Sequence, residues 1–141
     1  MRGNLWANFC GGAAGSGTGS ELKAFQRFLS QSRVPFQRMA PANDLVEDGG
    51  STRFVLAEVG HHYVVYSSSG IFTLNISSSE LQAQWFNPRD PNASLGTPFS
   101  ISSGSQTFIP PNSVNKDWVL WISNGSNLNR GLTHLISLLY Y

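Results

Sequence analysis

Paired carboxylates are the first chemistry to look for in this sequence, because two of them about 5–10 Å apart can hydrolyse a glycosidic bond. Most of the acids lie in expected turns, where such residues are common. The exceptions are Glu58, which stands inside an apolar run, and Asp117, which directly precedes an aromatic stretch. Because a buried acid normally has a cationic partner, we expect Glu58 to be half-buried and paired with Arg53 or Arg89. The acids therefore indicate structural roles, and the sequence assigns no catalytic residue.

The three histidines do not form a metal-ligand pattern. His61 and His62 are adjacent, so in an extended strand their side chains leave opposite faces and cannot both bind one ion. His134 lies far away in the sequence. The glycines of residues 11–19 lack the Lys-Ser/Thr ending of a phosphate-binding loop, and their spacing misses the dinucleotide-binding pattern. We therefore predict no metal site and no cofactor, and we interpret the glycine-rich stretch as a loop or linker.

Aromatic side chains supply the candidates for ligand binding. Tryptophan and tyrosine rings can stack on sugar rings, although in a small β domain most of them are core residues. Trp118 and Trp121 lie on opposite faces of one predicted strand, so we expect at least one of them at a surface or an interface. The candidate ligand-binding residues are Tyr66, Trp85, Arg89, Trp118 and Trp121.

The composition argues against several classes of protein function. A chain of 141 residues usually forms one domain with its own core. Charged residues make up only 12% of the chain, the net charge is +1, and no run of one sign occurs. This pattern argues against binding to nucleic acid or to an anionic membrane. No apolar run approaches the ~20 residues that span a bilayer, and the first residues make a poor secretory signal.

Covalent modification has few candidates. Cys10 is the single cysteine, so the chain has no disulfide framework of its own. Asn75, Asn92 and Asn124 each begin an Asn-X-Ser acceptor triplet for N-glycosylation, on a predicted exposed face or loop. The triplets matter only if a eukaryote secretes the protein, and the residues alone do not fix its localisation.

One stretch has clear helical periodicity. Ser20 can cap a helix over residues 20–31, and Glu21 suits its first turn. Apolar side chains recur on one face of it at Leu22, Phe25, Phe28 and Leu29. Because Pro35 disfavours helical structure in the residue before it, we expect the helix to end ahead of that point.

After residue 52 the apolar pattern becomes that of β-strands. The predicted strands are 53–59, 62–67, 70–76, 81–86, 97–102, 106–109 and 117–122. The first two are nearly continuous apolar runs, which indicates a central hairpin with both faces covered. Seven short strands at roughly even spacing are typical of an antiparallel sandwich or barrel. We expect a mainly β fold, an antiparallel β-sandwich preceded by one α-helix.

The chain divides into three parts by composition. We expect a glycine-rich lead-in with the helix at 1–40, the β-sandwich at 41–123 and a tail at 124–141. The tail becomes apolar from Leu132 onward, and its pattern fits either an extra strand or a short amphipathic helix.

Several short motifs follow the order of a known domain family. They are residues 41–46, 54–57, 63–66, 85–89, 108–111 and 117–120. Together they resemble the collagen-binding domain that follows the TIM barrel in apiosidase-like glycoside hydrolases, over about residues 41–122. The lead-in, with residues 5–8 and the glycines after them, is similar to the end of such a barrel. Two features depart from the family and fit a truncated or independently evolved reading frame: the glycine-rich loop runs straight into the helix, and residues 132–141 add an apolar end.

The resemblance implies an accessory β-sandwich attached to a carbohydrate-cleaving barrel, in a secreted or periplasmic protein. The catalytic carboxylates of such enzymes lie on barrel strands that this chain lacks, because only about 40 residues precede the sandwich and a barrel needs about 250. We therefore expect a chain that is noncatalytic by itself, with a polysaccharide or a catalytic TIM barrel as its partner. The alternative is a structural or adhesive module that self-associates or binds a protein such as collagen, because an apolar helix and tail can drive association.

Overall fold

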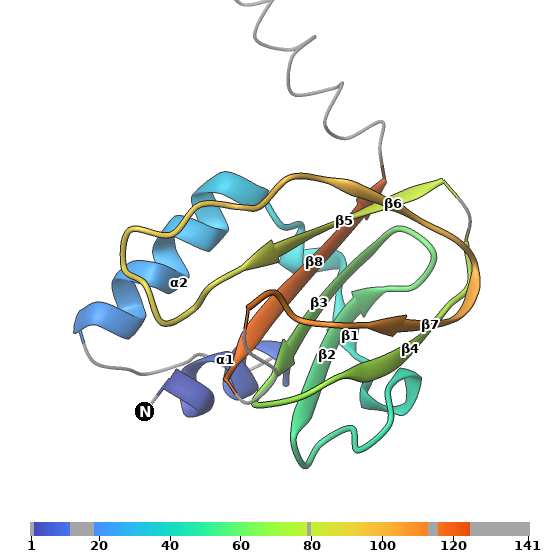
Figure 1. Ribbon diagram of the computed structural model, residues 1–141, viewed down its shortest axis with the longest axis horizontal. Coiled ribbons are helices and arrows are strands. Elements are labelled where there is room, and N and C mark those ends of the chain that lie inside the picture. The colour runs from blue at the N-terminus through green and yellow to red at the C-terminus, as the bar shows by residue number, and fades with distance from the viewer. Residues whose placement is uncertain (1, 12–18, 79, 113–115, 125–141) are drawn as a thin grey trace, which may run out of the picture.

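The computed structural model describes residues 2–11, 19–78, 80–112 and 116–124 (Figure 1). These residues form three layers: a pair of helices, a six-stranded sheet and a two-stranded sheet. The helices are α1 (Arg2–Cys10) and α2 (Gly19–Ser32), followed by the 3-10 turns η1 (Phe36–Arg38) and η2 (Asn43–Leu45). The strands are β1 (Ala40–Pro41), β2 (Arg53–Glu58), β3 (His62–Ser67), β4 (Phe72–Ile76), β5 (Leu81–Phe86), β6 (Phe99–Ile101), β7 (Gly104–Phe108) and β8 (Trp118–Asn124).

The six-stranded sheet is the middle layer. Its strand order is β1-β2-β3-β8-β5-β6, and β4 pairs with β7 in the second sheet. All of these pairs are antiparallel. One face of the middle sheet packs on β4 and β7, and the other packs on α1 and α2. The mainly β, antiparallel fold is therefore confirmed, with its second sheet reduced to two strands.

The central strands explain the continuous apolar runs. Every residue of β3 is buried. Tyr63 and Val65 belong to the core cluster on the side of β4 and β7, whereas Val64 and Tyr66 belong to the cluster beneath the helices. Because alternate side chains of a strand point to opposite faces, two covered faces remove the usual apolar–polar alternation. Both faces of the central hairpin are covered, as the sequence predicted.

Helix α1 is an element that the sequence analysis did not predict. It lies where the lead-in was expected to be a loop or the remnant of a barrel end. Leu5 and Phe9 are four residues apart in the sequence, and so are Trp6 and Cys10, which is the spacing of residues on one face of a helix. The Trp6 side chain is fully buried, and its ring lies 5.3 Å from that of Phe28 in α2. Burial against α2 and the sheet stabilises this short helix, which has little stability in isolation.

The chain changes sheet between β6 and β7. Predicted strand 97–102 is observed as β6, at an edge of the middle sheet, and predicted strand 106–109 begins earlier, at Gly104 in β7. Two residues, Ser102 and Ser103, connect them. Gly104 has a φ of +96°, which other residues rarely adopt, so this glycine permits the sharp change of direction.

Part of the sequence analysis concerns residues outside the described ranges. The tail from residue 125 onward and the glycines at 12–18 lie there, so the two interpretations of the tail stay open. The division of the chain at residues 40 and 124 also stays a prediction. Among the described helices, none is long and apolar enough to cross a bilayer.

Candidate ligand-binding site

Four of the five predicted ligand-binding residues meet at one end of the middle sheet, where β3 and β5 finish and β8 begins. They are Tyr66, Trp85, Arg89 and Trp118, and they gather beside Asp117. We call these five residues the Arg89 corner. β3 and β5 each pair with β8, which brings chain segments about fifty residues apart in sequence together here.

Asp117 contacts residues from both faces of the middle sheet. The Tyr66 hydroxyl donates to Oδ2 of Asp117 over 3.0 Å. Arg89 Nε lies 3.4 Å from Oδ1 and donates to the Asp117 carbonyl oxygen over 3.2 Å. The Asp117 side chain is only 7% exposed, so these contacts replace the water that a carboxylate otherwise needs. Asp117 therefore has a structural role.

A row of aromatic rings extends from this acid across the sheet. The guanidinium carbon of Arg89 lies 5.0 Å from the centre of the Trp118 ring, at cation–π distance. Trp85 meets Trp118 edge to face, with ring centres 6.2 Å apart, and Phe72 meets Trp85 in the same way at 6.1 Å. The row thus links β8, β5 and β4, and it joins the two sheets at this end.

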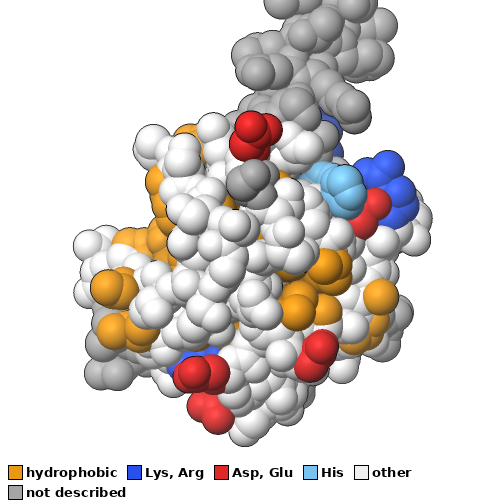
Figure 2. All heavy atoms as spheres, turned by 90° about the vertical axis from the view of Figure 1, so that its right-hand side faces the viewer, with side chains coloured by type: hydrophobic (Ala, Val, Ile, Leu, Met, Phe, Trp, Pro, Cys, Tyr) orange, Lys and Arg blue, Asp and Glu red, His pale blue; other side chains and the backbone are white. Residues whose placement is uncertain are grey.

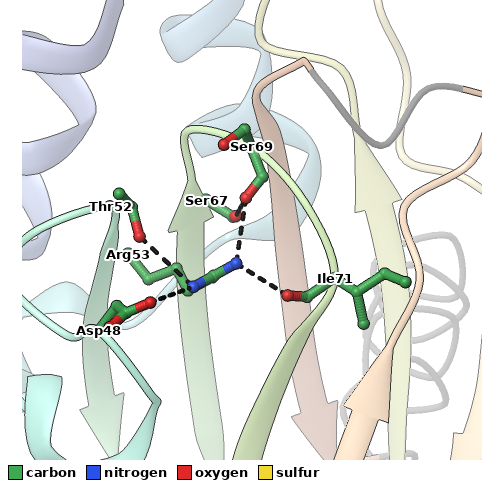
Figure 3. Close-up of polar contacts among 6 residues, drawn as sticks. All are labelled: Asp48, Thr52, Arg53, Ser67, Ser69 and Ile71. Atoms are coloured by element: carbon green, nitrogen blue, oxygen red, sulfur yellow. Dashed lines mark hydrogen bonds and ion pairs between the residues drawn. The ribbon is translucent and has the colours of Figure 1, made fainter.

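Arg53 lies at the other end of the row, and Figure 3 shows its polar contacts. Its guanidinium lies 6.0 Å from the centre of the Phe72 ring. Nη1 of Arg53 reaches Asp48 at 3.2 Å, and Nη2 donates to the carbonyl oxygens of Ser69 and Ile71 over 3.1 and 2.8 Å. Because both terminal nitrogens are engaged, Arg53 has a structural role, whereas Arg89 uses only its Nε within the described residues.

The predicted exposure of the tryptophans is wrong. Trp118 and Trp121 are 9% and 2% exposed, and Tyr66 is buried as well. Trp118 is covered by Arg89 and Trp85, and Trp121 by the helices, because both faces of β8 carry a layer. Their rings are therefore packing surfaces of the core in this chain.

Trp121 also lies apart from the Arg89 corner. Its ring stacks on His62 at 5.6 Å and packs edge-on against Phe28 of α2. His62 pairs with Glu58 near the opposite ends of β2 and β3. Trp121 is thus the one candidate that the fold separates from the others.

The accessible part of the Arg89 corner is small. Trp85 is half-buried, and the Arg89 side chain is 22% exposed. Among the described residues, nothing accepts a hydrogen bond from the two terminal nitrogens of Arg89. A partly exposed aromatic ring beside free N–H donors suits a neutral ligand that offers an apolar face and oxygen acceptors.

Glu58 has partners other than those predicted. It is half-buried, as expected, but neither Arg53 nor Arg89 reaches it. Oε1 of Glu58 lies 2.8 Å from Nδ1 of His62, and Oε2 lies 3.3 Å from Nε of Arg38. The hydrogen bond with His62, followed by the charge of Arg38, lowers the pKa of Glu58. Sequence patterns gave no signal for Arg38, because the turn that presents it follows a helix in another layer.

Metal-binding and modification candidates complete the site residues. Within the described residues, no group of three His, Cys, Asp or Glu side chains could hold a metal ion. Asn75 in β4 and Asn92 in the loop after β5 are exposed, and Asn124 at the end of β8 is half-buried. Glycosylation at these positions stays a prediction.

Comparison with known proteins identifies the β region. Residues 40–123, more than half of the chain, match the family described as "Putative collagen-binding domain of a collagenase". This chain belongs to that family. The resemblance seen in the sequence is therefore confirmed, and the Arg89 corner lies entirely inside the collagen-binding family's span.

Two solved structures with a fold similar to that of this family member are glycoside hydrolases. One, a glycoside hydrolase, is 17% identical, covers 75% of this chain and 25% of its own, and has a TM-score of 0.59. Another, a glycoside hydrolase family 5 protein from Bacteroides vulgatus, is 17% identical, covers 75% of this chain and 24% of its own, and has a TM-score of 0.58. The chain thus spans about a quarter of their length. Among curated proteins, none matches it.

Proposed function

We propose that this chain is the noncatalytic accessory domain of a glycoside hydrolase-like protein, and that its Arg89 corner binds polysaccharide. The observation that carries the proposal is the extent of the likeness. The fold corresponds to about a quarter of two glycoside hydrolases, and the family assignment covers the β region alone. The polysaccharide part is an inference from the chemistry of Trp85 and Arg89.

The engagement of the acids supports a noncatalytic role. A glycosidase needs two carboxylates that face the same sugar, one of them free to donate or accept a proton. Asp117 is buried between Tyr66 and Arg89, and Glu58 is tied to His62 and Arg38. Each of the two unusual acids thus has the contacts of a structural residue.

Binding is tested with the purified chain and a panel of insoluble and soluble polysaccharides. We expect retention on at least one of them, and at least tenfold weaker binding by Trp85→Ala and by Arg89→Lys, since the loss of a central contact costs upwards of 1 kcal/mol. Arg89→Lys keeps the charge but loses the planar fork. Phe36→Ala removes a 49% exposed ring in η1, which lies on the helical side, and is the matched control.

The outcomes of this experiment distinguish a polysaccharide-binding role from a role in supporting a catalytic barrel. If no polysaccharide retains the chain, the binding part of the proposal is wrong, and a role in supporting a catalytic barrel remains. If Phe36→Ala weakens binding as much as Trp85→Ala, the Arg89 corner is the wrong site.

The description of the family favours a second candidate, a module that binds a protein such as collagen. Collagen chains are polyproline II helices, whose regular carbonyl groups and proline rings suit an aromatic surface with N–H donors. The same variants should then lose retention on fibrillar collagen. Retention on collagen without retention on any polysaccharide would decide for this candidate.

A further inference from the structure

The N-terminal part of the chain and its β part carry opposite net charge. Residues 1–40, which include both helices, contain five basic side chains and one acidic one, a net charge of +4. Residues 41–124 contain three basic and seven acidic side chains, a net charge of −4. Arg130 brings the total to +1, so the small net charge of the chain conceals a separation of charge along it. Exposed apolar residues also lie on both sides, at Leu22 and Phe36 on the helical side and at Ile71 and Ile109 on the β side.

The helical face is basic and apolar. We define it by Leu22, Lys23, Arg33, Phe36 and Arg38, all exposed in α2 and the segment that follows it. Leu22 and Phe36 are 40% and 49% exposed, and the Arg38 side chain is 62% exposed. Arg38 is paired with the half-buried Glu58, so the charge of this face comes mainly from Lys23 and Arg33, and none of the face's described residues is an exposed acid.

The exposed ring of the helical face belongs to a larger cluster. The Phe36 ring lies 6.5 Å from Phe9 of α1, which lies 5.0 Å from Phe25 of α2. Phe9 and Phe25 are themselves only half-buried. The apolar surface is therefore continuous with the core beneath the helices, and contiguous apolar surface of this kind marks contact sites.

The β face is acidic and apolar. We define it by Asp44, Glu47, Asp48, Ile71 and Ile109, all exposed. Ile71 and Ile109 are 49% and 63% exposed. Asp48 and Ile71 both contact the Arg53 guanidinium, which holds them near each other (Figure 3).

Pairing between strands completes the β face. Phe72 and Phe108 form the last pair between β4 and β7. Ile71 and Ile109 are the residues just beyond this pair, so they lie at the same end of the two-stranded sheet. A bridge between Val46 and Leu74 holds the acidic turn against β4. Figure 2 looks onto this side of the molecule and shows acidic side chains spread around apolar groups, with basic side chains beside some of the acidic ones.

We propose that the helical face of one molecule docks on the β face of a second copy. Phe36 packs near Phe9 of α1, which lies on one side of the middle sheet, whereas the acidic turn is bridged to β4, which lies on the other side. Each face repels its own kind and attracts the other, which disfavours a symmetric dimer through either face. The contact is head to tail, so it can continue into a linear chain of copies. This gives a geometry to the self-associating alternative and does not depend on polysaccharide binding at the Arg89 corner.

Two double charge reversals test the contact in the full chain by light scattering across a concentration series. The first is Lys23→Glu with Arg33→Glu, and the second is Asp44→Lys with Glu47→Lys. We expect the unmodified protein to associate at about 0.05 M salt and to dissociate at about 0.5 M, where screening is strong. Each double variant alone should stay monomeric. An equimolar mixture of the two should regain the association, because each then presents the charge that the other lacks.

The mixture makes the test specific. Association that survives in both double variants overturns the proposal, and so does a protein that stays monomeric at low salt. Circular dichroism checks that the variants fold, and Phe36→Ser, which removes an exposed ring rather than a charge, should also abolish association. Lys116→Glu, an exposed reversal outside both faces, should leave it unchanged. Polysaccharide retention by the double variants should match that of the unmodified protein, which separates failure of this contact from failure of the proposed function.

Discussion

Glu58 and Asp117 take their roles from residues that the fold brings to them. Asp117 accepts from Tyr66, 51 positions earlier, and Glu58 meets Arg38 from the turn after α2. Asp117 is buried and Glu58 is half-buried, and each has a cation within 4 Å. The contacts of Glu58 favour its ionised form, so they stabilise the protein only while its carboxylate is charged.

Glu58 gives a pH-dependent prediction. Its pKa is held below the ordinary value of 4.5, first by the hydrogen bond with His62 and then by Arg38. A carboxyl whose pKa is lower in the folded than in the unfolded protein stabilises the fold above the ordinary pKa, and the contribution is lost as the pH falls through the folded value. We expect Glu58→Gln to lower the urea midpoint at about pH 6, and the difference from the unmodified protein to shrink toward about pH 3.

Urea denaturation at a series of pH values measures this difference. Glu47→Gln removes an exposed carboxylate from the turn before β2 and is the control, with little expected effect at any pH. A difference that grows as the pH falls would show that the contacts of Glu58 do not favour its ionised form.

At the scale of elements, the nine-residue helix α1 contributes a central side chain, Trp6, to the core beneath the helices. Trp6 contacts rings of both helices and lies parallel to Tyr66 of β3 at 6.2 Å. It also meets Phe86 of β5 at 6.2 Å. One side chain thus joins the helical layer to two strands of the middle sheet.

Trp6→Ala should destabilise the protein by about 3–5 kcal/mol, the usual cost of removing a large buried ring and leaving a cavity. The free energy of unfolding, from urea titration followed by circular dichroism, measures the effect. Asn8→Ala alters an exposed position of the same helix and should change stability by no more than about 0.5 kcal/mol. Equal effects of the two substitutions would mean that α1 is not packed on the sheet.

At the scale of the whole molecule, the helices share a core cluster with the strands of the middle sheet. Cys10 of α1 illustrates this, since its Sγ lies 3.9 Å from the carbonyl oxygen of Val64 in β3. Burial raises the pKa of the Cys10 thiol to about 12, which leaves almost no reactive thiolate at neutral pH. The cysteine therefore reports on whether the helical layer has opened.

We expect the helical layer and the sheets to unfold together. Labelling of Cys10 by a thiol reagent and the loss of β circular dichroism should have the same urea midpoint, as in a two-state transition. Labelling at clearly lower urea would instead support a separate unit at residues 1–40, the division that composition predicts.

The sequence by itself determined strands β2 to β8, α2 and the family, because each rests on a local pattern, whereas the two-residue β1 was not predicted. Period-two and period-3.6 spacing is read within a few residues, and the family motifs keep their order along the chain. The predicted bounds of β3 and β5 agree with the structure for this reason. The sequence of α1 also has apolar residues four positions apart. The stretch is short, however, and the glycines that follow it favour a loop.

Only the tertiary structure decided which residues form the site and which are covered. Trp118 and Trp121 lie on opposite faces of β8, as strand geometry requires, and yet both are buried because the sheet has a layer on each side. Strand pairing between β5 and β8 placed Arg89 beside Asp117, 28 positions later, and no local spacing carries that information. Burial depends on what packs against a residue, whereas the sequence specifies only the direction in which its side chain points.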